Sequence, residues 1–208
     1  VSKSNQLNNH TIIKLKNKKI NIIFNIYSDE NVDLFIDEII PTIEYVCNLS
    51  PSNTKNIVIN YYLLDINKNI ENKDYLTVKE VNSGSCTYTN NSSAEITLWR
   101  KEEVMKVTIH ELFHALRYDT IDDTDRIIHE YQKKYNISSN TINTNEAYTE
   151  LWANIINAYL LSKRIKRNDY NLFLILIHLE KHFSLFQCSK IFKKFNMKKK
   201  KNYDINKN

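Results

Sequence analysis

Glycine and proline are scarce in this chain of 208 residues, which contains one glycine (Gly84) and two prolines (Pro41 and Pro51). Asparagine, isoleucine, lysine and tyrosine are abundant instead, a bias that we attribute to an AT-rich genome rather than to selection on the protein. Composition, including the net charge of +5, is therefore a weak guide to function. Motifs and their spacing carry more information.

Cysteine is also rare: Cys47, Cys86 and Cys188 are widely spaced, and no C-x-x-C occurs. This pattern excludes a recognisable zinc knuckle or disulfide framework and predicts reduced thiols. No apolar run reaches the roughly 18 residues that a membrane span requires, and no signal peptide is visible. These absences favour an intracellular, cytoplasmic protein without a transmembrane segment.

The hydrophobic content of 42% excludes wholesale disorder, and a chain of this length can bury a core without disulfide or metal staples. Alternating, strand-like patterns come before the long helical ones. They predict an α+β fold: a small mixed sheet with an edge strand beside an active-site helix, then a mainly helical C-terminal half. We expect a single domain over residues 1–192, β-rich to about 99 and helical from about 100, and a basic flexible tail over 193–208.

Hydrophobic periodicity and capping signals predict the individual elements. The first ten residues, Val1–His10, are polar and expected to fray. The expected strands are Lys19–Tyr27, Asn56–Leu64, Tyr75–Val81, Ser85–Thr89 and Ser92–Trp99. The expected helices are Val32–Leu49, Lys101–Tyr118, one that Asp122–Asp125 caps and that runs to Tyr135, one from Thr144 to Leu161, and Tyr170–Phe195.

The most informative stretch is His110-Glu111-Leu112-Phe113-His114, an H-E-x-x-H pattern inside an expected helix. Residues four apart lie on one helix face, so both imidazoles can bind one zinc ion. Glu111 is rotated away from that pair but can take a proton from a zinc-activated water. The pattern predicts a catalytic Zn²⁺ site with His110 and His114 as ligands and Glu111 as the general base.

A third ligand is expected from the helix that follows Thr144. Glu146 and Glu150 are four apart on one face of it. Glu146 can complete a His, His, Glu ligand set, and Glu150 can accept the second ring N–H of a ligand histidine. The alternative is a pair of solvated glutamates near a helix start, where acidic residues suit the helix dipole.

These two motifs resemble those of the thermolysin-like zinc peptidases, the gluzincins, over Ala94 to Leu161. That zincin family pairs H-E-x-x-H with a helix carrying N-E-x-x-x-D, whereas this chain has Asn145-Glu146-Ala147-Tyr148-Thr149-Glu150, with Glu in place of Asp. The resemblance implies a zinc-dependent endopeptidase acting on polypeptides, with Glu150 orienting a histidine. The composition and motifs are also similar to those of predicted metallopeptidases of large DNA viruses.

The same resemblance implies a substrate-binding edge strand before the active-site helix, and we place it at Ser92–Trp99. Its rim would be Ala94, Glu95, Ile96 and Thr97, whose backbone would pair with an extended peptide; the alternative is simply the last strand of a sheet. For stabilisation of the oxyanion, the family's added His or Tyr suggests Tyr148 or His178, and His182, Tyr118 and Tyr159 are further candidates that the sequence does not separate from them. Asp119 is either a turn residue or an orienter of His114.

Two alternative readings remain at this point. His129 is the rival third ligand, and an all-histidine set would resemble SprT-like proteases that act on DNA–protein crosslinks. The basic run Lys193–Lys201 would then serve nucleic-acid binding, although such a run is usually a solvated end. The other alternative is a catalytically inactive zincin-fold binding protein, against which the presence of Glu111 argues.

Overall fold

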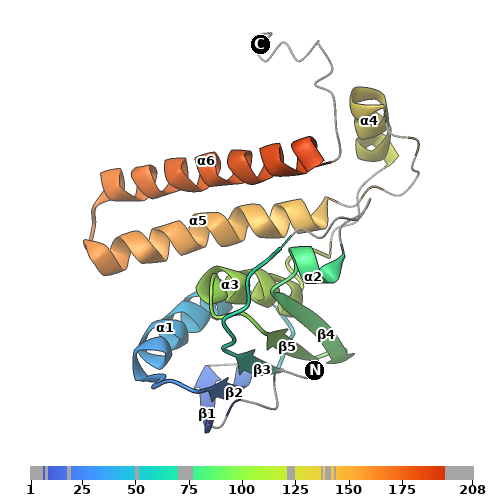
Figure 1. Cartoon of the computed structure of the whole chain (residues 1–208). Coiled ribbons are helices and arrows are strands. Elements are labelled where there is room, and N and C mark those ends of the chain that lie inside the picture. The colour runs from blue at the N-terminus through green and yellow to red at the C-terminus, as the bar shows by residue number, and fades with distance from the viewer. Residues whose placement is uncertain are drawn as a thin grey trace.

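A computed structural model describes residues 7, 9–17, 20–49, 52–69, 77–120, 125–136, 138, 142 and 144–194 (Figure 1). Most of the expected basic tail, residues 195–208, lies outside this range. Five strands form a mixed sheet: β1 (Asn9–Asn17), β2 (Ile20–Ser28), β3 (Asn56–Tyr62), β4 (Gly84–Asn90) and β5 (Ser93–Leu98). Their order across the sheet is β1-β2-β3-β5-β4. The strands β2, β3 and β5 are parallel, and the two edge strands β1 and β4 are antiparallel to their neighbours.

The described helices are α1 (Asp33–Leu49), α2 (Val78–Val81), α3 (Val104–Ala115), α4 (Asp125–Tyr135), α5 (Asn145–Ile165) and α6 (Tyr170–Lys194). Helices α1 and α3 lie over the sheet, α5 packs on α3, and α6 packs on α5 (Figure 1). All five described strands end by Leu98, and every described element after that residue is a helix. The predicted α+β class is therefore confirmed. Within the described residues, no helix is long and apolar enough to cross a membrane.

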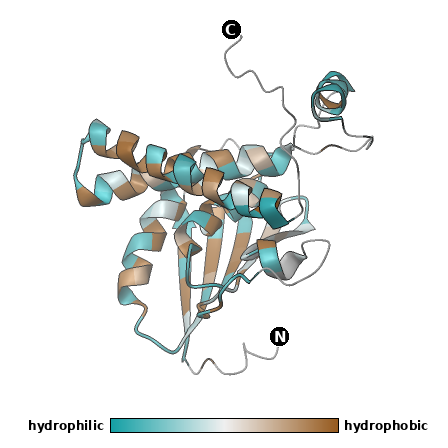
Figure 2. Ribbon diagram, turned by 45° about the horizontal axis from the view of Figure 1, so that its top comes forward, coloured by the Kyte–Doolittle hydropathy of each residue, from teal (hydrophilic) through white to brown (hydrophobic). Residues whose placement is uncertain are grey.

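The core lies between one face of the sheet and helices α1 and α3. Alternate side chains of the three parallel strands point into it, because successive strand residues face opposite sides of a sheet. Figure 2 shows apolar stretches running along the strands beneath the helices. The fully buried members include Phe24, Ile59, Tyr61, Ile96, Ile109 and Leu112. Helix α3 contributes the last two, so packing against the sheet fixes the helix that carries the H-E-x-x-H motif.

The opposite face of the sheet carries a row of hydrogen-bonded polar side chains. Asn25 Nδ2 donates to Asn60 Oδ1 (2.8 Å), and Asn60 Nδ2 donates to Glu95 Oε1 (2.7 Å), which links three neighbouring strands. The side chain of Glu95 therefore lies on the face away from α3. This position does not suit Glu95 for the substrate rim that the sequence suggests.

The prediction that Ser92–Trp99 is the edge strand is wrong. It forms β5, which pairs with β3 on one side and with β4 on the other, so the backbone of Ala94, Glu95, Ile96 and Thr97 is not free to bind a peptide. The edge strand beside α3 is β4. The reason is burial: Ala94 and Ile96 belong to the core, whereas most β4 side chains are exposed, as edge strands favour.

Two other local predictions also fail. Asn9 and His10, which the sequence predicts to fray, belong to β1, since a nine-residue antiparallel register with β2 supplies hydrogen-bond partners. Most of the remaining part of that prediction, residues 1–6 and 8, lies outside the described residues. Residues 78–81 form the short helix α2 rather than a strand. Glu80 Oε2 accepts a hydrogen bond from the Thr77 backbone N–H at 2.7 Å, an interaction typical of a capping box that closes the first helical turn.

Candidate metal centre

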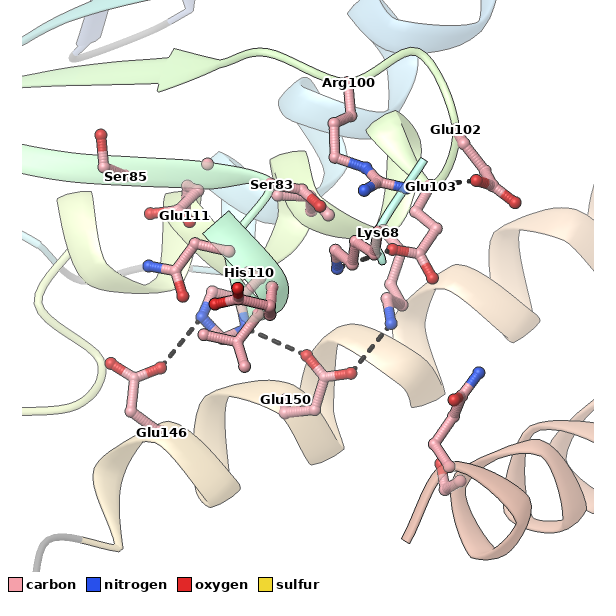
Figure 3. Close-up of a pocket in the computed structure, with 18 of the residues that line it drawn as sticks. Lys68, Ser83, Ser85, Arg100, Glu102, Glu103, His110, Glu111, Glu146 and Glu150 are labelled. Carbon is pink, nitrogen blue, oxygen red and sulfur yellow. Dashed lines mark hydrogen bonds and ion pairs between the residues drawn. The ribbon is translucent and has the colours of Figure 1, made fainter. Parts of the chain in front are cut away.

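Helix α3 lies between the sheet and α5, and this position sorts its polar side chains. Ile109 and Leu112 face the core. His110 and His114, one turn apart, face the first turn of α5, where Glu146 lies. Figure 3 shows His110 opposite Glu146. Glu111 points the other way, towards the start of strand β4. Helix α3 therefore presents two histidines towards α5 and the Glu111 carboxylate towards β4. This follows from the helical period of 3.6 residues, because residues four apart share a face and adjacent residues do not.

The ligand atoms of His110, His114 and Glu146 converge. All of them lie within 4.8 Å of one another, and no other such group occurs in the described part of the chain. The two Nε2 atoms are 3.1 Å apart. His110 Nε2 is 3.2 Å from Glu146 Oε2, and His114 Nε2 is 3.6 Å from Glu146 Oε1. The structure thus brings together the three residues that the sequence suggests as ligands, and the group is suited to holding a metal ion.

These separations fit a small divalent cation. Tetrahedral zinc with bonds of about 2.0–2.1 Å to nitrogen and oxygen would place its ligand atoms roughly 3.3–3.4 Å apart. The three distances among the histidine Nε2 atoms and the Glu146 oxygens, 3.1, 3.2 and 3.6 Å, lie on either side of that value. Two imidazole nitrogens and one carboxylate are also a donor set that zinc accepts, and three protein ligands leave a coordination position open. Glu146 is 69% exposed, so the site is reachable from solvent.

The second ring nitrogen of His110 contacts Glu150, one turn along α5 from Glu146. His110 Nδ1 is 3.2 Å from Glu150 Oε2, and Lys106 Nζ is 2.9 Å from the other oxygen of the same carboxylate. These hydrogen bonds outweigh burial and lower the pKa of Glu150 to about 2. A carboxylate held ionised in this way favours the Nδ1–H tautomer of His110, which leaves Nε2 free to bind a metal.

His114 has an equivalent partner in Asp119. Helix α3 ends at Ala115, and Arg117, two residues further on, adopts a left-handed conformation (φ 60°) of the kind common after helix C-termini. Asp119 Oδ2 lies 2.6 Å from His114 Nδ1. The end of the helix is fastened to the edge strand as well, because Tyr88 Oη donates to the backbone oxygen of His114 at 2.5 Å. Of the two roles considered for Asp119, the structure supports the orienting one.

Glu111 is the buried carboxylate of the site, with a relative exposure of 6%. Burial raises its pKa above the ordinary glutamate value, and His110 and His114 oppose that rise by their charge. It lines a cleft of about 1320 Å³ that also contains His110, His114, Glu146 and Glu150. A carboxyl group with a raised pKa next to a ligand cluster is suited to accepting a proton near neutral pH.

Several residues singled out in the sequence lie elsewhere. Tyr148 and His178 are exposed, and neither lines the cleft, so the structure does not bring the two suggested oxyanion residues to the ligand group. His129 is exposed on α4 and does not belong to the cluster. The histidine alternative for the third ligand therefore finds no support among the described residues.

Two contributors to the site are not apparent from the sequence patterns. Lys106 holds Glu150 from one turn before His110, and only the packing of α3 on α5 brings these residues together. Gly84 lies against Glu111 across the interface between β4 and α3. Its signal in the sequence was its rarity, since it is the single glycine of the chain.

No protein-family model matches this chain, and neither do the curated proteins or the solved structures compared with it. The function is therefore inferred from the geometry of the site.

Proposed function

We propose that this protein is a zinc-dependent peptidase that hydrolyses polypeptide substrates. The observation that carries the proposal is the convergence of His110, His114 and Glu146 to within 4.8 Å beside the buried carboxylate of Glu111. A structural zinc site has no need for that carboxylate, and such sites usually have four protein ligands. Three ligands, an open position and an adjacent base favour hydrolysis.

Each residue has a definite task in this proposal. His110, His114 and Glu146 hold the ion, while Glu150 and Asp119 hold the Nδ1 sides of the two imidazoles. When bound, zinc supplies Lewis-acid chemistry, lowering the pKa of a coordinated water and polarising a carbonyl. Glu111 takes the proton of the attacking water on its carboxylate and passes it to the departing amine.

The edge strand β4 gives a place for the substrate. Within the described part of the sheet it has a neighbour on one side only, and it borders the cleft through Gly84, Ser85, Cys86 and Tyr88. An extended peptide that adds to this edge gains backbone hydrogen bonds and lies along α3. This assigns to β4 the role that the resemblance to gluzincins implies for residues 94–97.

The test separates the base from the ligands. Elemental analysis of the purified wild type is expected to give one zinc ion per chain, with hydrolysis of a peptide library. Glu111→Gln is expected to keep the zinc and lose roughly 10²- to 10⁴-fold in kcat. Glu146→Ala is expected to lose the zinc itself. His129→Ala serves as the matched control and is expected to keep both the zinc and the peptidase activity. A wild type without zinc, or full activity in Glu111→Gln, would refute the proposal.

A further inference from the structure

Gly84 is the first residue of β4 and pairs with Leu98 of β5. It is buried, and its Cα faces helix α3 at Glu111. A Cβ atom built at this position would lie 2.8 Å from Glu111 Oε1, 3.0 Å from Glu111 Cγ and 3.0 Å from Val107 Cγ1. Figure 3 shows Glu111 next to this strand, near Ser83 and Ser85, which flank Gly84 in the chain. The space that a side chain would occupy is therefore already filled by the carboxylate of Glu111.

Backbone conformation does not explain this glycine, because its φ is not positive. The described chain has four residues with left-handed φ, and none is a glycine: Glu103, Arg117, Asn136 and Asn168. The chain therefore does without glycine where the backbone favours it. It uses its single glycine where a side chain would collide with Glu111. Close approach of strand and helix is the remaining physical reason for Gly84.

We propose that Gly84 is a positioning residue for Glu111: by lacking a Cβ, it lets the carboxylate lie between β4 and α3 beside His110 and His114. The inference rests on the proposed peptidase function for its catalytic consequence, but the position of the carboxylate can be tested without it. A contact of 2.8 Å is too short for carbon and oxygen atoms, so a side chain at residue 84 displaces the far end of Glu111. Neither His110 nor His114 is among the nearest atoms, so the ligand set stays in place.

The experiment compares Gly84→Ala with the wild type. The variant is expected to bind zinc with the stoichiometry of the wild type and to unfold at nearly the same temperature, because the flexible end of Glu111 can move. Its kcat is expected to fall about tenfold or more with little change in KM, since small displacements of a catalytic group are costly. Crystal structures of the wild type and of Gly84→Ala are to be compared. The Glu111 carboxylate is expected to lie farther from residue 84 in the variant.

Two further variants separate positioning from a general effect on the strand. Thr87→Ser removes one methyl group from the same strand, at a residue that pairs with Glu95 on the face away from α3 and does not line the cleft, and is expected to keep the wild-type kcat. In a Glu111→Gln background, Gly84→Ala is expected to cause no additional loss of the residual rate, because the group it acts through is already gone. If Gly84→Ala does not fold, the double variant Gly84→Ala/Val107→Ala takes its place in the comparison. It removes the Val107 side chain, one of the two neighbours that a Cβ at residue 84 would crowd.

The outcomes distinguish this inference from the proposed function. An active, zinc-containing wild type whose kcat is unchanged in Gly84→Ala would overturn the role of Gly84 and leave the peptidase proposal standing. A wild type without zinc or activity would overturn the peptidase proposal. In that case the crystal structures still decide: a displaced carboxylate supports the positioning role, and an unmoved one overturns it.

Discussion

At the scale of single residues, the site depends on what each imidazole nitrogen contacts. His110 uses Nε2 towards Glu146 and Nδ1 towards Glu150, and His114 uses Nε2 towards Glu146 and Nδ1 towards Asp119. The carboxylates on the Nδ1 side stabilise an N–H there, which leaves both Nε2 lone pairs directed at one point. Without a cation, Glu150 favours the protonated form of His110, so protons would compete with a metal ion for this nitrogen ligand.

Zinc affinity should therefore depend on pH. Burial lowers the pKa of His110, but the hydrogen bond that its Nδ1–H donates to Glu150 and the charges of Glu111, Glu150 and Glu146 outweigh it, so the pKa is raised above 6.5. The imidazolium then persists above that pH and must lose its proton before zinc binds. We expect the apparent zinc affinity to keep rising with pH above 6.5, by up to about tenfold per unit for each proton released.

Competition titrations with a chelator of known affinity, between pH 6 and 8.5, measure this dependence. An affinity that levels off below pH 6.5 would show that His110 is already neutral there. Exchange of zinc for cadmium or cobalt in the same titrations gives a control, because the proton released by the protein is the same for each metal.

At the scale of elements, the site exists because α3 and α5 pack against each other. Glu150 of α5 lies between Lys106 and His110, which are one turn apart on α3. The three-residue contact sets the rotation of α5, and Glu146, one turn earlier on α5, then faces both histidines. Removal of Glu150 should therefore weaken zinc binding although it is not a ligand.

We expect Glu150→Ala to lower zinc affinity roughly 10- to 100-fold, the range typical of carboxylates that orient a ligand histidine. Glu150→Gln should cost less, because its amide oxygen can still accept from His110 Nδ1. Isothermal titration with zinc measures both. Glu180→Ala is the matched control, since Glu180 lines the same cleft but has no hydrogen bond or ion pair with either histidine among the described contacts. A loss of affinity in that control equal to the loss in Glu150→Ala would show that overall cleft charge, rather than orientation, matters.

At the scale of the whole molecule, the metal would connect two parts of the fold. His110 and His114 belong to the layer packed on the sheet, and Glu146 belongs to the α5–α6 pair, of which α6 has no buried residue. A ligand that binds only the folded state stabilises it by mass action, by about 2.7 kcal/mol at 100 times its Kd. For a chain of this size that corresponds to roughly 5–10 °C in Tm.

Chelation of zinc should lower Tm by about that amount, and added zinc should restore it. The Glu146→Ala variant should unfold at the temperature of the chelated wild type and show no response to zinc. Differential scanning calorimetry of both proteins tests this. A wild-type Tm that does not change on chelation would mean that the ion does not hold α5 to α3.

The sequence by itself determined the parts of the site that depend on local periodicity. His110, Glu111 and His114 follow from spacing on one helix, and Glu146 and Glu150 from spacing on another, because a helix fixes the relative direction of residues four apart. The boundaries of most helices and of the central strands follow from the same regularity.

The tertiary structure decided the features that local periodicity in the sequence does not encode. Which strand lies at the edge of the sheet depends on which one buries more apolar surface. β5 takes the interior position because its side chains are more apolar than those of β4. The contacts of Lys106 with Glu150 and of Gly84 with Glu111 join residues on different elements and arise only when α3 packs against α5 and against the sheet. The contact of Asp119 with His114 depends on the conformation of the turn after α3, which the sequence left open.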